Sequence, residues 1–229
     1  VKITEKTDYP FTEDILFIVE TETPVKFPFY IRIPSWCKNP IITINTEMQE
    51  IDAYNGLICI NRTWENADQV AVSFPMQVTL TKWYERSVAV ERGPLVYALK
   101  MEENWTNKPF VGEDAKWHGT NYWEITSSSP WNYALIDVQP EDMENQYKFY
   151  AQDEIPLFPW NVNDAPVQIR TVAKKVPHWT LYNESAGPIP YSIAYDMPVG
   201  ETDSITLIPY GATKLRIAEF PVTGRYSIK

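Results

Sequence analysis

Paired carboxylates are the residues of this chain that could most directly catalyse a reaction. The pairs are Glu102/Glu103, Glu113/Asp114, Glu141/Asp142 and Asp153/Glu154. Two carboxyl groups about 5–10 Å apart, one of them with a raised pKa, can hydrolyse a glycosidic bond. Each pair here stands in a polar, loop-like segment, outside any Trp- or Gly-framed cluster that would desolvate it. We therefore interpret all four pairs as solvated surface charge, and we assign no catalytic residue.

Patterns for metal binding and nucleophilic catalysis are sparse. His118 and His178 have no Cys or Asp at ligand spacing, so we predict no metal site. The Asn161–Asp164 segment offers oxygen atoms at alternate positions, as a Ca²⁺ loop would, but we favour an ordinary turn. The serines at 127–129 lack a nucleophile elbow, and the chain has no Gly-rich phosphate loop. No cofactor is expected.

Aromatic side chains are the remaining candidates for ligand binding. A flat indole can stack on the C–H face of a sugar ring, and exposed Trp or Tyr residues provide such platforms in carbohydrate-binding sandwiches. Large aromatic residues also dominate cores and interfaces, so packing of loops or of a domain interface is the favoured explanation. If the chain binds a sugar, the predicted set is Trp105, Trp117, Tyr122, Trp123 and Trp131.

Composition limits the partners and the class of protein. The chain has 229 residues, 44% of them hydrophobic, which is enough for one large or two ordinary domains. Its net charge of −10 repels phosphate backbones, so no nucleic-acid partner is expected. No apolar run is long enough for a membrane span. Cys37 and Cys59 could form a disulfide, although two buried free thiols in strands are favoured.

Short strands must position these residues. Phe27, Phe29 and Ile31 alternate with polar or outward neighbours, a period-two pattern typical of a half-buried strand. Nineteen Pro against eight Gly favour short strands joined by stiff loops. The sequence therefore predicts an all-β protein with little helix, made of two antiparallel, jelly-roll-like β-sandwich units.

Domain limits follow from the loss of this pattern. Between Met101 and about Trp123 the alternation dissolves, which we interpret as a long loop or linker. We predict a first sandwich at residues 1–102 and a second, with long loops, at 103–229. The segments 205–208 and 214–217 are predicted to form a hairpin-like pair. The last strands either form part of an independent sandwich or return to the first.

Six segments in order along the chain resemble one family. They are similar to the β-sandwich region that follows the catalytic barrel in the β-L-arabinofuranosidase-like enzymes of glycoside hydrolase family 127, in the form common among gut Bacteroidetes. The segments are Thr7–Phe11, Ile31–Trp36, Ile60–Trp64, Val90–Tyr97, Ser129–Leu135 and Leu207–Arg216.

The resemblance implies that the catalytic residues lie in a domain other than this one. Such enzymes have an (α/α)₆ barrel whose zinc-bound cysteine thiolate is the nucleophile, and nothing in this chain matches that motif. Neither Cys37 nor Cys59 inherits the role. The chain is thus expected to be a non-catalytic portion, inactive alone, that supports or completes the sugar cleft of the missing barrel. An exposed apolar patch is expected where the barrel would dock.

The expected partners are the barrel and a plant-type glycan. The localisation does not follow from the residues, whereas the bacterial resemblance implies the periplasm or the exterior. The alternative is a free-standing carbohydrate-binding module that uses the exposed Trp and Tyr residues. An autonomous hydrolase with a site built from distant carboxylates is the least favoured possibility.

Overall fold

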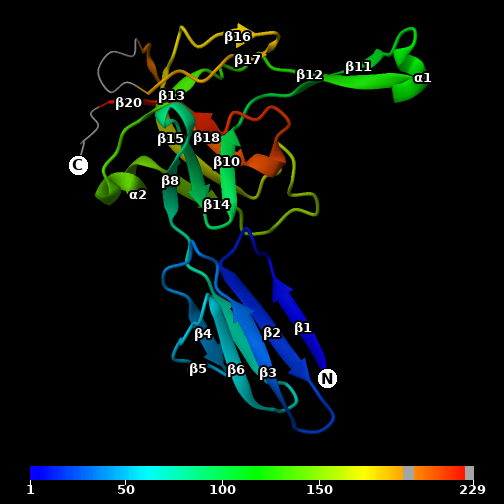
Figure 1. The fold of residues 1–229 in the computed structure, drawn as a ribbon, viewed down its shortest axis with the longest axis vertical. Coiled ribbons are helices and arrows are strands. Elements are labelled where there is room, and N and C mark those ends of the chain that lie inside the picture. The colour runs from blue at the N-terminus through cyan, green and yellow to red at the C-terminus, as the bar shows by residue number, and fades with distance from the viewer. Residues whose placement is uncertain (193–198, 225–229) are drawn as a thin grey trace. The chain divides into compact units, whose positions relative to one another are not determined.

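The computed structural model describes residues 1–192 and 199–224, and it divides into two compact units. The first unit consists of Val1–Gln77 and Arg92–Pro94. The second unit consists of Val78–Glu91 and the chain from Leu95 onward. Strands dominate both units and the helices are short, which confirms the prediction of an all-β protein with little helix (Figure 1).

The first unit is a β-sandwich of two antiparallel sheets. One sheet has the strand order β1-β2-β7-β4-β5, and the other pairs β3 with β6. Successive side chains of each strand point to opposite faces, so one face of each sheet contributes to a shared core. The strands are β1 Lys2–Thr7, β2 Asp14–Glu20, β3 Val25–Arg32, β4 Ile41–Ile44, β5 Glu47–Met48, β6 Leu57–Trp64 and β7 Gln69–Ser73.

Trp64 lies at the centre of that core. It has no exposed surface, and its ring centroid is 5.6 Å from that of Phe27 and 5.9 Å from that of Phe29. Its indole N–H donates to the backbone carbonyl of Phe27 at 3.0 Å, so the polar atom of this large ring is satisfied. The predicted alternation along β3 is confirmed, because Phe27, Phe29 and Ile31 all pack into this core.

The three residues that return to the first unit are fixed by Glu13. Its carboxylate accepts from the guanidinium of Arg92 at 2.5 Å and from the backbone N–H of Met76 at 3.0 Å. Gly93 follows with a φ of +58°, a conformation that favours glycine. A Cβ at this position would also collide with the side chain of Met76. The bend therefore requires glycine.

The second unit is built on a nine-stranded sheet. Its main path runs β19-β9-β10-β18-β15-β13-β20, while β14 also pairs with β15 and β8 with β9. Strand β15 is antiparallel to β13, β14 and β18, and β13 pairs in parallel with β20. The strands are β8 Val78–Lys82, β9 Val88–Arg92, β10 Leu95–Leu99, β13 Tyr133–Ile136, β14 Lys148–Ala151, β15 Val167–Lys175, β18 Thr202–Pro209, β19 Glu219–Phe220 and β20 Val222–Thr223.

Two hairpins and several short helices complete the second unit. The longer hairpin joins β11 (Asn104–Pro109) to β12 (Asn121–Thr126), and the shorter joins β16 (Leu181–Tyr182) to β17 (Ser185–Ala186). Among residues 1–192 and 199–224, no helix has the length and apolar character that a membrane crossing requires. The helical turns are α1 Asp114–His118, α2 Met143–Gln146, η1 Tyr84–Arg86, η2 Pro140–Asp142 and η3 Tyr210–Ala212.

The division into units differs from the boundary expected near residue 102. Strands β9 and β10 lie before that point, yet they pair with β19 and β18 in the second unit. Period-two alternation marks a strand but does not reveal which sheet the strand joins. The last strands, β18, β19 and β20, pair with strands of the second unit and with none of the strands β1 to β7.

Two local predictions were wrong. The segment from Met101 to Trp123 is not a long loop, because most of it forms β11, α1 and the start of β12. Nearly all of this hairpin is exposed, so no face of it shows the apolar alternation of a core strand. The segment 214–217 is not a strand either, since η3 and an irregular stretch follow β18.

Candidate functional site

The β11–β12 hairpin carries four of the five predicted aromatic residues. The six cross-strand pairs run from Asn104 opposite Thr126, at the base, to Pro109 opposite Asn121. Figure 1 shows the hairpin extending away from the sheet of the second unit, with α1 at its far end. A two-stranded hairpin with both faces exposed has little intrinsic stability. Its base and its aromatic residues must therefore hold it together.

Trp105 and Trp123 share one face of this hairpin. They lie on a diagonal of the ladder, since Trp105 stands opposite Ile125 and Trp123 opposite Asn107. Their ring centroids are 6.1 Å apart and the rings meet edge to face at 70°. Trp105 is 48% exposed and Trp123 is 59% exposed, so both rings keep surface open to a ligand.

Tyr122 and Trp117 lie nearer the tip. Tyr122 packs against Phe110 with ring centroids 4.8 Å apart, and Phe110 also contacts the ring of His118 at 5.6 Å. Trp117 on α1 is 80% exposed. Five residue steps of about 3.3 Å separate Asn104 from the end of β11, so α1 lies about 17 Å beyond the base of the hairpin.

Trp131 does not join the hairpin residues. It packs edge to face on Trp179, with centroids 5.0 Å apart, in a small core with Ala134 and Val176. Its neighbour Asn132 donates to the backbone carbonyls of Val176 and Trp179 at 2.9 and 3.1 Å. Of the five predicted residues, Trp131 thus has the position expected of a packing residue.

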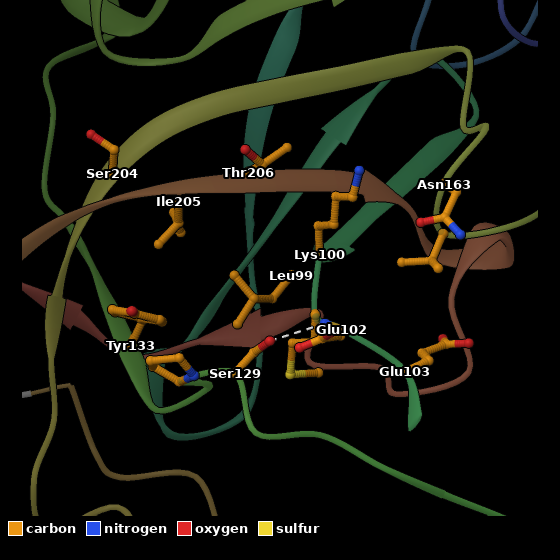
Figure 2. Close-up of a pocket in the computed structure, with 13 residues that line it drawn as sticks. Leu99, Lys100, Glu102, Glu103, Ser129, Tyr133, Asn163, Ser204, Ile205 and Thr206 are labelled. Carbon is orange, nitrogen blue, oxygen red and sulfur yellow. Dashed lines mark hydrogen bonds between the residues drawn. The ribbon is translucent and has the colours of Figure 1, made fainter. Parts of the chain in front are cut away.

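A pocket of about 610 Å³ lies next to the base of the hairpin, within the second unit (Figure 2). This volume is within the range of roughly 300–1,000 Å³ that is common for small-molecule sites. Leu99, Met101 and Ile205 supply apolar surface, and polar side chains surround it. The polar lining is Lys100, Glu102, Glu103, Ser129, Tyr133, Asn163, Ser204 and Thr206.

Glu103 joins the pocket to the hairpin. One oxygen of its carboxylate accepts from the hydroxyl of Thr213 at 2.9 Å and from the backbone N–H of Lys214 at 2.6 Å. The other oxygen accepts from the indole N–H of Trp105 at 3.2 Å. A residue interpreted as solvated surface charge is therefore a half-buried acceptor that fixes the orientation of Trp105.

Glu102 differs from its neighbour. Its backbone N–H donates to the hydroxyl of Ser129 at 3.0 Å, the bond drawn in Figure 2. Its carboxylate lines the pocket and has no hydrogen-bond or ion-pair partner within the described ranges 1–192 and 199–224. This carboxylate is thus available to accept hydrogen bonds from a ligand.

Tyr133 closes the pocket from the core side. Its hydroxyl donates to Asp203 at 2.8 Å, and Asp203 also pairs with Lys175 at 3.1 Å. Burial, reinforced by the hydrogen bond to Asp203, raises the pKa of Tyr133 to about 12. The bonds from Tyr133 and Lys175 lower the pKa of Asp203. Near neutral pH Tyr133 therefore stays protonated and Asp203 stays ionised, and their hydrogen bond fixes this side of the pocket.

The loop at 158–164 supplies the opposite side. The side-chain amide of Asn161 donates to the carbonyl of Phe158 at 2.6 Å, and its oxygen accepts from the backbone N–H groups of Asn163 and Asp164. Asn161 therefore makes the ordinary turn that the sequence favoured. The turn places the side chain of Asn163 in the lining of the pocket.

The cysteines lie elsewhere. Both are free: Cys37 is buried and Cys59 is exposed, so the expectation of two buried thiols was wrong for Cys59. Burial raises the pKa of the Cys37 thiol, and the charge of Glu13 adds to this. A raised pKa disfavours the thiolate form that a nucleophile needs. In the described ranges no three His, Cys, Asp or Glu residues are close enough to hold a metal ion.

The residues that line the pocket could not be grouped from the sequence alone. Glu102, Ser129 and Asn163 stand about thirty residues apart in sequence, in segments that carry no shared motif. The one signal in the sequence is that Trp105 stands two residues after Glu103, because a carboxylate near an indole N–H can fix the ring. The pairing of β10 with β18 then determines where Lys100 and Thr206 meet.

Part of the chain is similar to a known protein family. Residues 1–76 match the model of the β-L-arabinofuranosidase GH127 middle domain. This match confirms, for residues 1–76, the resemblance inferred from the sequence. No curated protein matches the chain.

Solved structures extend the likeness in fold to nearly the whole chain. A GH127 β-L-arabinofuranosidase from Geobacillus stearothermophilus T6 is 24% identical with a TM-score of 0.61, covering 96% of this chain and 30% of that one. A structure described as a glycoside hydrolase is 21% identical with a TM-score of 0.58, and the match covers 97% of this chain and 32% of that one. A GH127 β-arabinofuranosidase is 20% identical with a TM-score of 0.61, and the match covers 96% of this chain and 31% of that one. The chain therefore spans about a third of the length of these enzymes.

Proposed function

We propose that this chain is the non-catalytic β-rich portion of a GH127-type glycoside hydrolase, which braces or completes the sugar cleft of an (α/α)₆ barrel outside this sequence. One observation carries the proposal. The chain is similar in fold, over 96% of its length, to 30% of a GH127 β-L-arabinofuranosidase, and its first 76 residues match the GH127 middle domain. The activity on a β-L-arabinofuranoside is expected of the combined protein.

A candidate docking face supports this role in the first unit. The outward face of the β3–β6 ribbon carries Tyr30 and Leu57, which are 63% and 45% exposed. Tyr30 stands directly opposite Cys59, which is also exposed, and Leu57 stands opposite Arg32. Tyr54, 81% exposed, bridges to Leu57 by two backbone hydrogen bonds of 3.0 Å. An apolar stripe of this kind on a thin ribbon fits a protein partner.

The test begins with the DNA upstream of the codon for Val1. An in-frame barrel should be encoded there, and the barrel should be expressed with and without residues 1–229. We expect hydrolysis of p-nitrophenyl β-L-arabinofuranoside by the combined protein, at least about tenfold less by the barrel alone, and none by the chain alone.

Paired substitutions locate the docking face. Tyr30→Ser with Leu57→Ser should weaken assembly of the separately expressed barrel and chain. The matched control is Leu181→Ser with Tyr182→Ser on β16, whose side chains are similarly exposed. Turnover by residues 1–229 alone, or full activity of the barrel without them, would contradict the proposal.

A further inference from the structure

We propose that the pocket beside the base of the β11–β12 hairpin binds a neutral oligosaccharide, with Trp105 as the stacking platform and Glu102 and Asn163 as partners for sugar hydroxyls. The site belongs to the second unit alone. It can therefore be occupied without any barrel, so its test is independent of the function proposed above.

The pocket combines the two surfaces that a sugar residue needs. Leu99, Met101 and Ile205 contribute apolar atoms to the lining, and polar side chains contribute the rest. Figure 2 shows Glu103 and Asn163 at one end of the pocket, Tyr133 at the other, and Glu102 between them. A sugar ring presents C–H groups on its faces and hydroxyls around its edge, which suits a lining that offers both apolar atoms and hydrogen-bonding groups.

Glu102 provides the strongest acceptor. Its carboxylate lines the pocket without a protein partner in the described parts of the chain. A carboxylate that accepts from two neighbouring hydroxyls makes charge-assisted bonds, which are stronger than neutral ones. The amide of Asn163 and the ammonium of Lys100 add donors to the lining of the same pocket.

Trp105 provides the platform. Trp105 is not part of the lining, but its indole N–H donates to Glu103, which is, so the ring is held beside the pocket. The edge-to-face contact with Trp123 supports the ring from the neighbouring strand. About half of the Trp105 side chain stays exposed, which leaves ring surface for stacking. Fixing the ring beforehand reduces the entropy lost on binding.

Charge selects the class of sugar. Two carboxylates and one lysine line the pocket, and the whole chain carries a net charge of −10. A lining with net negative charge repels uronate sugars and favours uncharged ones. The inferred ligand is therefore a neutral oligosaccharide and not a polyuronate.

The experiment uses the 229-residue chain without any barrel. It is titrated calorimetrically with neutral arabino-, xylo- and gluco-oligosaccharides of about six residues, and with oligogalacturonate as the anionic probe. We expect saturable binding of at least one neutral probe, and at least about tenfold weaker binding of oligogalacturonate. Glu102→Gln and Trp105→Ala should each weaken the neutral probe about tenfold or more.

Matched variants separate binding from folding. Trp117→Ala removes a more exposed indole from the same hairpin and should change affinity less than about twofold. Glu102→Gln alters a side chain that supports no other residue, so it remains informative if Trp105→Ala loosens the hairpin. Near-ultraviolet circular dichroism checks that each variant is folded.

Three results would overturn the proposal. The first is no saturable binding of any neutral probe by the folded chain. The second is binding that Trp117→Ala weakens as much as Trp105→Ala and Glu102→Gln do. The third is oligogalacturonate binding as tightly as the best neutral probe.

Discussion

Replacing Trp64 by Ala should destabilise the first unit by most of its folding free energy. Trp64 is fully buried, and removing such a ring from a core costs about 3–5 kcal/mol. Loss of the bond from its indole to the Phe27 carbonyl adds about 1 kcal/mol. A unit of about 80 residues is stable by roughly 4–12 kcal/mol, so a total cost of about 4–6 kcal/mol is severe.

Urea unfolding followed by far-ultraviolet circular dichroism measures this effect. The two units have separate cores. In the Trp64→Ala variant we therefore expect the first unit to unfold already at low urea, whereas the unfolding transition of the second unit stays at its wild-type urea concentration. Trp117→Ala, at a surface position, should shift neither transition by more than about 0.5 kcal/mol. A cost below about 1 kcal/mol for Trp64→Ala would refute the assignment of Trp64 to the centre of this core.

Three further perturbations probe the other contacts. Asp68 is buried; burial raises its pKa, but bonds from the Glu65 backbone and from Asn45, with the charge of Arg62, outweigh this and lower it. The ionised form thus stabilises the fold above the unfolded pKa of about 3.9. Asp68→Asn should cost about 2 kcal/mol at pH 7 by urea unfolding, and the gap to wild type should narrow as the pH falls below about 4. Gly93→Ala should cost about 1–3 kcal/mol in the same assay because of its positive φ and the contact with Met76, whereas an unchanged midpoint would argue against that bend. Glu103→Ala should speed amide exchange at Lys214 at least about tenfold, with Glu102→Ala as the control that leaves it unchanged.

The β-rich fold of the chain was largely predictable from local pattern. Alternation at Phe27, Phe29 and Ile31 identified a strand with one buried face, and the structure places them there. Proline-rich corners and the resemblance to a sandwich region pointed to the same class. Local pattern failed where the partner strand is distant, since nothing in residues 95–99 shows that β18 lies beside them.

The candidate site was predictable only in its aromatic part. Trp105 and Trp123 share a face because strands alternate, which a correct assignment of β11 and β12 would have shown. The hairpin was missed because neither face is buried, so its sequence lacks an apolar period. Trp131 was grouped with these residues by proximity in sequence, although it packs on Trp179 far along the chain.

The pairing of β9 and β10 with the last strands has a practical consequence for anyone who dissects this protein. A cut at residue 102 would leave β10 without β18 and β9 without β19, each fragment exposing unpaired sheet edges that invite aggregation. A proteolytic nick there should therefore leave the two pieces bound to each other, and only denaturant should part them.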